Sequence, residues 1–282
     1  HGLEHCWPHS LLAQARGDAA LQCWLADPAA RSEALPSALQ SRWVDTGTLP
    51  SRPLPENEIR AAVADEAALL QGLFGAAPPV AVPNTFVWTD AVERAWAASG
   101  VTCIVTPGRR LEGRSASGGL LPPTRTIRNG ERTASGAIQV VRDDYFEPIR
   151  GHRAERVWQA VATKTLLGRP TLLETHRESF IAAREPADRA LDELERALRG
   201  VLQRHPDVHF MSTAALARHL ADPASPLLGH SQLHRLGVFV QRVLHEASLG
   251  RLLKFSGLRI MLALAARLIR RVTHGRVSVM AR

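Results

Sequence analysis

Short apolar runs alternate with helix-like segments between residues 80 and 211, and polar residues follow the end of each run. The runs lie at 80–82, 101–105, 137–141, 171–173 and 208–211. Alternation of this kind is typical of a parallel α/β core. Ligands of such folds bind at the carboxyl ends of the strands. The pattern alone does not separate a doubly wound sheet from a barrel.

The segments between the runs carry helix signals. Apolar residues at helical spacing predict helices over 56–74, 153–167 and 186–204, and Gly75 supplies a stop for the first. A further helix begins at Thr89 or Asp90, where Glu93 is placed for a capping box. Residues 106–135 have no apolar period, which predicts a functional lid or a disordered insertion.

The charge of the chain is unevenly distributed. The whole sequence is 45% apolar with a net charge of +8, yet residues 1–222 carry 25 Lys or Arg against 26 Asp or Glu. Residues 223–282 carry 10 against 1. We therefore expect an α/β domain over 1–222 and a basic helical tail over 223–282.

The tail contains two amphipathic segments, 232–247 and 249–272. Basic amphipathic helices can lie on an anionic membrane surface, which predicts a membrane contact through 232–272. The alternative is that both helices pack on the α/β domain over 1–222 or on a second subunit. Nucleic acid is not an expected partner, because the tail has few aromatic side chains for base stacking.

The number and spacing of the cysteines indicate in which cellular compartment the protein is located. Cys6, Cys23 and Cys103 are odd in number and lack metal-type spacing, which favours reduced thiols over a disulfide framework. A cytoplasmic location, or one on the cytoplasmic face of a membrane, is the expectation.

His176 is the first candidate for a catalytic residue. The apolar run at 171–173 stops at Glu174-Thr175-His176-Arg177, and an imidazole that titrates near neutral pH is suited to proton transfer. The alternative is a structural strand terminus in which His176 and Arg177 pair with Glu174 or Glu178.

The chain begins His1-Gly2-Leu3-Glu4-His5. Two histidines four residues apart share one face of a helical turn, so both imidazoles could reach one divalent metal. His1-x-x-Glu4-His5 also spells a zinc-peptidase motif, with Glu4 as general base. That alternative requires a long helix, which Pro8 interrupts.

Several segments in order resemble the polysaccharide deacetylase-like superfamily, over most of residues 1–220. They are 1–5, 81–83 with Trp88, 142–148, 172–177 and 207–212. The resemblance implies an irregular seven-stranded (β/α) barrel and a metal-dependent hydrolase that removes acetyl groups from a glycan or amino sugar. The first strand would lie before His1 and would carry two Asp residues, one a metal ligand and one the base.

The resemblance also implies residue roles. His1 and His5 would hold the metal, zinc with cobalt or nickel as alternatives, and His176 would protonate the departing amine or alkoxide. Asp143 or Asp144 would orient His176. Substrate contacts are expected from Asn84, Trp88, Arg142, Tyr145 and Arg177, although ordinary packing is the alternative for Trp88 and Tyr145. A catalytically inactive barrel that binds carbohydrate or a membrane surface is the remaining functional alternative.

Overall fold

The computed structural model describes residues 3–181, 183–229, 231–246 and 249–280. The chain is α/β and divides into two compact units, each built from two stretches of sequence. The first unit comprises 1–143 with 211–222, and the second comprises 144–210 with 223–282. The chain passes between the units after residues 143, 210 and 222, so residues 144–210 group with 223–282.

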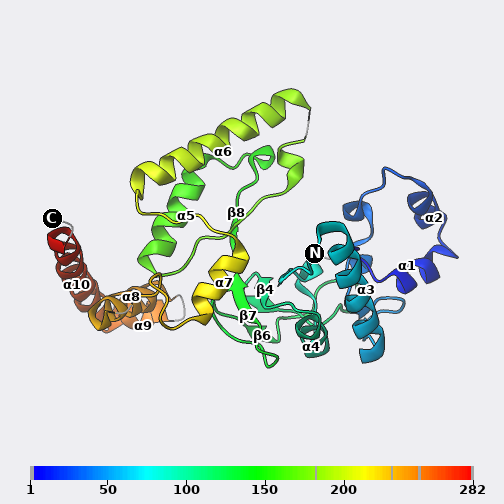
Figure 1. Ribbon diagram of the computed structural model, residues 1–282, viewed down its shortest axis with the longest axis horizontal. Coiled ribbons are helices and arrows are strands. Elements are labelled where there is room, and N and C mark those ends of the chain that lie inside the picture. The colour runs from blue at the N-terminus through cyan, green and yellow to red at the C-terminus, as the bar shows by residue number, and fades with distance from the viewer. Residues whose placement is uncertain (1–2, 182, 230, 247–248, 281–282) are drawn as a thin grey trace. The chain divides into compact units, whose positions relative to one another are not determined.

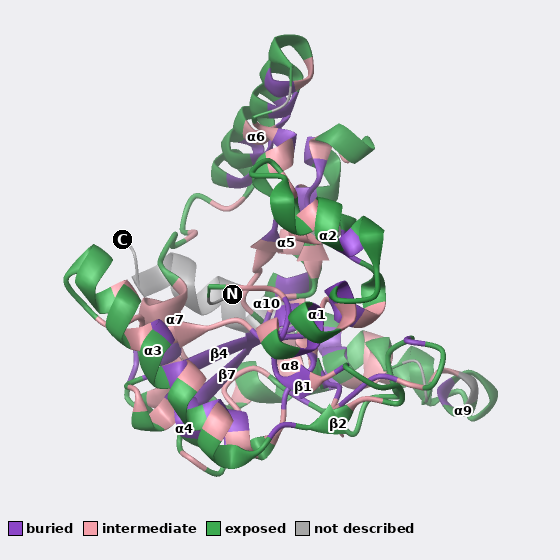
Figure 2. Ribbon diagram, turned by 90° about the vertical axis from the view of Figure 1, so that its right-hand side faces the viewer, coloured by how far each residue is buried: buried purple, intermediate pink, exposed green. Residues whose placement is uncertain are grey.

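The first unit is organised around a parallel three-stranded sheet of order β3-β4-β7. Its strands are β3 (Val80–Ala81), β4 (Cys103–Thr106) and β7 (Ile138–Val141). Cys103 pairs with Ile138 and Thr106 with Val141, and both longer strands are buried along their length (Figure 2). Buried β-branched runs of this kind form parallel strands that are covered on both faces.

Helices pack around this sheet. They are α3 (Glu56–Phe74), α4 (Asp90–Ala98) and α7 (Thr213–Ala221), whereas α1 (Pro8–Ala15) and α2 (Ala19–Ala26) pack against each other around a separate small core. The helix predicted over 56–74 is confirmed as α3, and Gly75 ends it at a φ of 76°. α3 lies beside α4, and together with the sheet they enclose a core that includes Trp43, Trp88 and Trp96 (Figure 1).

The capping box expected at the start of α4 is not formed. The Thr89 side chain makes no capping hydrogen bond. Glu93 turns inward instead, where its Oε1 accepts from Trp88 Nε1 at 2.9 Å and from Arg110 Nη1 at 3.3 Å. The buried indole N–H needs an acceptor, and Glu93 supplies it.

Residues 106–135 are an ordered part of the first unit instead of a disordered insertion. They contain an antiparallel pair, β5 (Arg109–Arg110) with β6 (Arg125–Thr126), and a second short pair, β1 (Val44–Asp45) with β2 (Arg52–Pro53), lies elsewhere in the unit. Arg114 is buried, and it donates to Ser41 Oγ at 2.9 Å and to Ser37 Oγ at 3.0 Å. Burial lowers the pKa of the Arg114 guanidinium. This buried arginine holds the segment onto residues 37–41.

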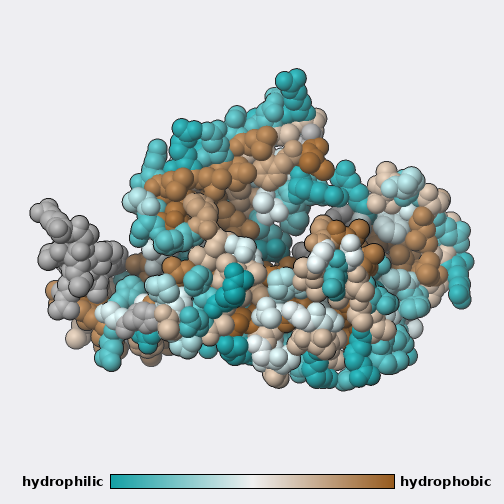
Figure 3. Space-filling view, in the orientation of Figure 1, coloured by the Kyte–Doolittle hydropathy of each residue, from teal (hydrophilic) through white to brown (hydrophobic). Residues whose placement is uncertain are grey.

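The second unit is a helical layer beside one short pair of parallel strands. The strands are β8 (Asp144–Tyr145) and β9 (Leu173–Glu174), and the helices are α5 (Ala154–Leu166) and α6 (Arg184–Arg204). α5 lies along α6 (Figure 1), around buried Phe146, Val157 and Val201. Other side chains of α6 are exposed, among them Leu191, Leu198 and Leu202. Figure 3 shows apolar surface in the region of this helix.

The tail helices belong to the second unit. α8 (Gln232–His245) docks on the end of α5, where Arg242 Nε donates to Leu167 O at 2.8 Å and Nη2 to Gly168 O at 3.0 Å. The segment expected over 249–272 is divided into α9 (Gly250–Phe255) and α10 (Leu258–Met280), with Gly257 between them at a φ of 71°. Among the described residues, no helix combines the length and apolarity needed to cross a membrane.

The predicted seven-stranded (β/α) barrel is wrong. Sheets in the described ranges contain two or three strands, and none closes on itself. A barrel requires each strand to continue one hydrogen-bond ladder. Here the ladder is interrupted after Val141, because β8 pairs with β9 in the second unit. The run at 208–211 forms no strand, although Ser212 does cap α7 as expected.

Candidate active site

His176 lies just beyond the carboxyl end of β9, as the sequence predicted. It precedes a short 3-10 turn, Arg177–Ser179, and its backbone remains extended. The His176 side chain is 53% exposed. A half-exposed imidazole at a strand end is accessible to a ligand while it remains in contact with the protein.

A buried carboxylate holds the ring. Glu147 Oε1 lies 2.6 Å from His176 Nδ1 and also accepts from the His176 backbone N–H at 3.0 Å. Its second oxygen, Oε2, accepts from the buried Ser179 hydroxyl at 2.9 Å. An ionised carboxylate can only accept, so the contact assigns the hydrogen to Nδ1 and leaves Nε2 able to take up a proton.

The segment that carries Glu147 is itself fixed. The Glu147 backbone N–H donates to His152 Nδ1 at 2.9 Å, and Phe146 N–H donates to Glu174 O at 2.8 Å. The carboxylate, the hydroxyl of Ser179 and the imidazole therefore belong to one connected hydrogen-bond network. Such a network restricts the orientation of the His176 ring.

A second carboxylate lies near the other ring nitrogen. Glu174 Oε1 is 3.6 Å from His176 Nε2, and Arg177 Nε is 3.8 Å from Glu178 Oε1. These are the pairings that the structural alternative predicted for this strand terminus. The geometry therefore agrees both with a proton-transfer site and with a charged strand end.

Two of the predicted substrate contacts lie near His176. Tyr145 is the register partner of Glu174, which lies two residues before His176. Its side chain is exposed, as is the neighbouring Arg177. Tyr145 on β8, and His176 and Arg177 just after β9, are thus three exposed or half-exposed side chains in the same part of the second unit.

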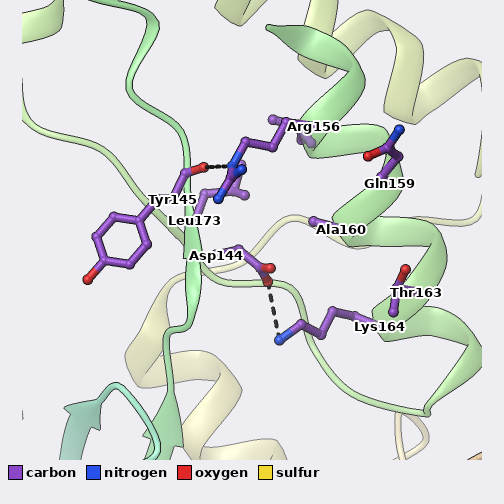
Figure 4. A pocket seen from close by; sticks show the side chains of 9 residues that line it. Asp144, Tyr145, Arg156, Gln159, Ala160, Thr163, Lys164 and Leu173 are labelled. Carbon is purple, nitrogen blue, oxygen red and sulfur yellow. Dashed lines mark hydrogen bonds and ion pairs between the residues drawn. The ribbon is translucent and has the colours of Figure 1, made fainter. Parts of the chain in front are cut away.

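The opposite face of β8 lines a cavity of about 240 Å³. Lys164 Nζ lies 3.4 Å from Asp144 Oδ2 in this cavity, and Arg156 Nε donates to Tyr145 O at 2.7 Å. The Tyr145 ring points away from Lys164 (Figure 4). Asp144 therefore faces Lys164 on the α5 side, and the carboxylates on His176 are Glu147 and Glu174.

The remaining predicted contacts belong to the first unit. Trp88 is fully buried and Asn84 is buried with its amide donating to Glu4 O at 3.1 Å, so neither side chain has an exposed face for a sugar. Arg142 is partly buried and Asp143 is exposed, both directly after β7. The predicted orienting role of Asp143 and the substrate role of Arg142 stay predictions.

The predicted metal pair is only partly described. His1 lies outside the described residues, and His5 is partly buried. Within the described ranges, no three His, Cys, Asp or Glu side chains lie together as a ligand set, so they do not by themselves fit a zinc site. The zinc, cobalt or nickel site stays a prediction, and no step proposed below depends on a metal.

The first residues also bear on the zinc-peptidase alternative. Residues 3–7 are not helical, and α1 begins only at Pro8. Glu4 Oε2 lies 3.3 Å from a guanidinium nitrogen of Arg42. The helix that this motif requires is therefore absent from residues 3–7.

Glu147 and Ser179 were not identified from the sequence. Glu147 lies in the 142–148 segment that carries the resemblance, but within that segment Asp143 or Asp144 was predicted to orient His176. The signal that identifies Glu147 is the pairing of β8 with β9, which brings residues 145–147 beside 174–176. That pairing joins segments far apart in the sequence, so no local sequence pattern indicates it.

Comparison of the chain with protein-family models, with curated proteins and with solved structures found no match.

Proposed function

We propose that this chain is a hydrolase that removes acetyl groups from a glycan or an amino sugar, with His176 as its general acid. The observation that supports this proposal is the contact of 2.6 Å between His176 Nδ1 and the buried carboxylate of Glu147. A histidine with one nitrogen bonded to a buried carboxylate and a half-exposed ring is arranged for proton transfer.

The steps assigned to the protein are limited to proton transfer and orientation. Glu147 fixes the ring and retains the hydrogen on Nδ1, so His176 Nε2 carries the proton that moves. Water adds to the acetyl carbonyl carbon, and the protonated ring gives this proton to the departing amine or alkoxide as the acetyl carbon–heteroatom bond breaks. The products are acetate and the free amine or alcohol. Tyr145 on β8 and Arg177 just after β9 are exposed, and in this proposal they supply an aromatic face and a cation to the sugar.

Acetate release from chitin oligosaccharides and from an O-acetylated glycan tests this proposal. We expect His176→Gln to lower kcat by a factor on the order of 10²–10⁴, because general acid catalysis is removed. Glu147→Gln should lower kcat less and leave KM nearly unchanged, since this buried side chain acts through the ring.

His209→Gln is the matched control, because it makes the same change at an exposed histidine of the second unit. It should retain full activity. Acetate release that is equal for His176→Gln and the parent chain, with both folded by circular dichroism, would show that His176 is a structural strand terminus.

A further inference from the structure

α9 and α10 expose a surface of large apolar side chains. Each of the following is more than half exposed: Leu252, Phe255, Ile260, Met261, Leu264 and Leu268. We name this set the tail face. Scattered exposed apolar residues are normal on a protein surface, whereas a contiguous set on adjacent helices marks a contact site.

The tail face is not the side by which these helices pack. α10 packs against α8, and Ala266 of α10 is buried. Ile269 of α10 lies close to Gly237 of α8, since a Cβ added to this glycine would be only 2.8 Å from Ile269 Cγ2. Met261, Leu264 and Leu268 recur at intervals of three and four, so they form a separate stripe along α10. α10 therefore has one apolar side on α8 and another that no described residue covers.

Basic residues accompany the stripe. Lys254, Arg259 and Arg267 are exposed on the same two helices. Residues 223–282 carry 10 Lys or Arg and one acidic residue, Glu246. An apolar stripe with cations beside it is the pattern of helices that lie in the headgroup region of anionic membranes.

The charge also argues against a second copy as the occupant. Apposing two such tails would bring together two segments that each carry a net charge of +9. Like charges at that density repel each other, whereas an anionic lipid surface is complementary to them.

We propose that α9 and α10 bind the surface of an anionic lipid bilayer, with the tail face inserted among the lipid headgroups. Lys254, Arg259 and Arg267 contact the headgroups, and the apolar side chains reach the boundary of the acyl chains. This contact is independent of the proposed acetyl hydrolysis at His176.

Co-sedimentation of the full chain with vesicles of phosphatidylcholine containing phosphatidylserine tests the proposal, with pure phosphatidylcholine vesicles as the neutral comparison. We expect binding to the anionic vesicles that weakens as the salt concentration rises from about 50 mM to about 500 mM. Arg259→Gln and Arg267→Gln should each weaken binding about fivefold. The triple variant Met261→Ser/Leu264→Ser/Leu268→Ser should abolish it.

A matched control alters three exposed apolar side chains in the first unit, Leu69→Ser/Leu73→Ser/Phe74→Ser on α3, and should bind as the parent chain does. Equal binding of the α10 triple variant and the parent, or binding that does not distinguish anionic from neutral vesicles, overturns the proposal. Absence of vesicle binding together with a dimer that the α10 triple variant dissociates would overturn it in favour of a second copy.

Discussion

Glu193 forms one of the links between the two main helices of the second unit, α5 and α6. It lies on α6 and is buried, and its Oε2 accepts from the Ala154 N–H at the start of α5 at 2.8 Å. Its Oε1 lies 2.6 Å from Arg196 Nη1 and 3.3 Å from Arg153 Nη1. A carboxylate that satisfies the first amide of a neighbouring helix acts as a cap supplied from outside that helix.

The environment of Glu193 determines how it responds to acid. Burial alone would raise the pKa of Glu193, but the Ala154 amide and the guanidinium groups of Arg196 and Arg153 outweigh burial, and the net pKa is lowered. A lowered pKa stabilises the fold above the ordinary glutamate pKa of about 4.3. This stabilisation is lost as the pH falls through the lower pKa of the folded state.

We therefore expect Glu193→Gln to lower the free energy of unfolding by about 2 kcal/mol at pH 7, because hydrogen bonds to a charged group are lost. The difference from the parent chain should shrink as the pH falls below about 4.3. Urea unfolding at several pH values measures it. Glu195→Gln, at an exposed ion pair with Arg199 on the same helix, should change stability by less than about 1 kcal/mol.

His176 shows how far sequence reasoning reaches at the scale of the residue. Its place at a strand end was predictable, because an apolar run followed by polar residues is a local signal. Its partner Glu147 lies 29 positions earlier, and their contact depends on strand pairing. For Trp88 a substrate contact and ordinary packing were both open, since nothing local tells a buried indole from an exposed one, and the side chain lies in the core.

Close contact between α5 and α6 depends on a glycine. Trp158 of α5 packs against Gly200 of α6, where a Cβ would overlap the indole ring. Trp158 Nε1 donates to Ala197 O at 3.1 Å, and the guanidinium of Arg204 lies 3.9 Å from the ring centroid. The glycine reduces the intrinsic stability of α6 but permits this approach.

Gly200→Ala should accordingly destabilise the chain by about 1–3 kcal/mol, since the strain of overpacking exceeds the gain in helix propensity of about 1 kcal/mol. Gly72→Ala is the matched control in α3, where a Cβ would meet nothing within 4 Å. That change should stabilise by up to about 1 kcal/mol. Thermal unfolding of both variants compares the signs, and stabilisation by Gly200→Ala would contradict the close packing described here.

Helices were predicted more accurately than sheets for a physical reason. The periodicities that define 56–74, 153–167 and 232–247 are local, and α3, α5 and α8 form there within a few residues of the predicted ends. The pairing of strands joins distant segments, so the runs at 80–82, 101–105 and 137–141 predicted three strands but not the order in which they pair. The barrel was inferred from resemblance, and the interruption after Val141 is what excludes it.

At the scale of the whole molecule, the tail belongs to the second unit. Arg242 on α8 bonds to the carbonyls of Leu167 and Gly168, and burial lowers the pKa of its guanidinium. Val238 occupies the space beside Gly168, whose φ is 57°. The sequence suggested a separate tail because composition changes at residue 223, but composition does not reveal docking of this kind.

We expect Arg242→Met to increase deuterium exchange in α8 and at the end of α5, because two carbonyls lose their donors. Exchange in β4 and β7 should be unchanged, since these strands belong to the other unit. Arg184→Met provides the comparison, as this side chain is 97% exposed. Faster exchange throughout both units would mean that they do not open separately.

The return of the chain to the first unit has a consequence for its biosynthesis. α7 packs on β4 and β7, with Arg132 Nη2 donating to Ala221 O at 3.3 Å, yet residues 144–210 separate α7 from those strands in the sequence. A growing polypeptide therefore leaves the ribosome with the first sheet uncovered on that side until residues 213–221 have been made. Domains usually fold one after another during translation. Here the ribosome must deliver most of the second unit before the first can be completed.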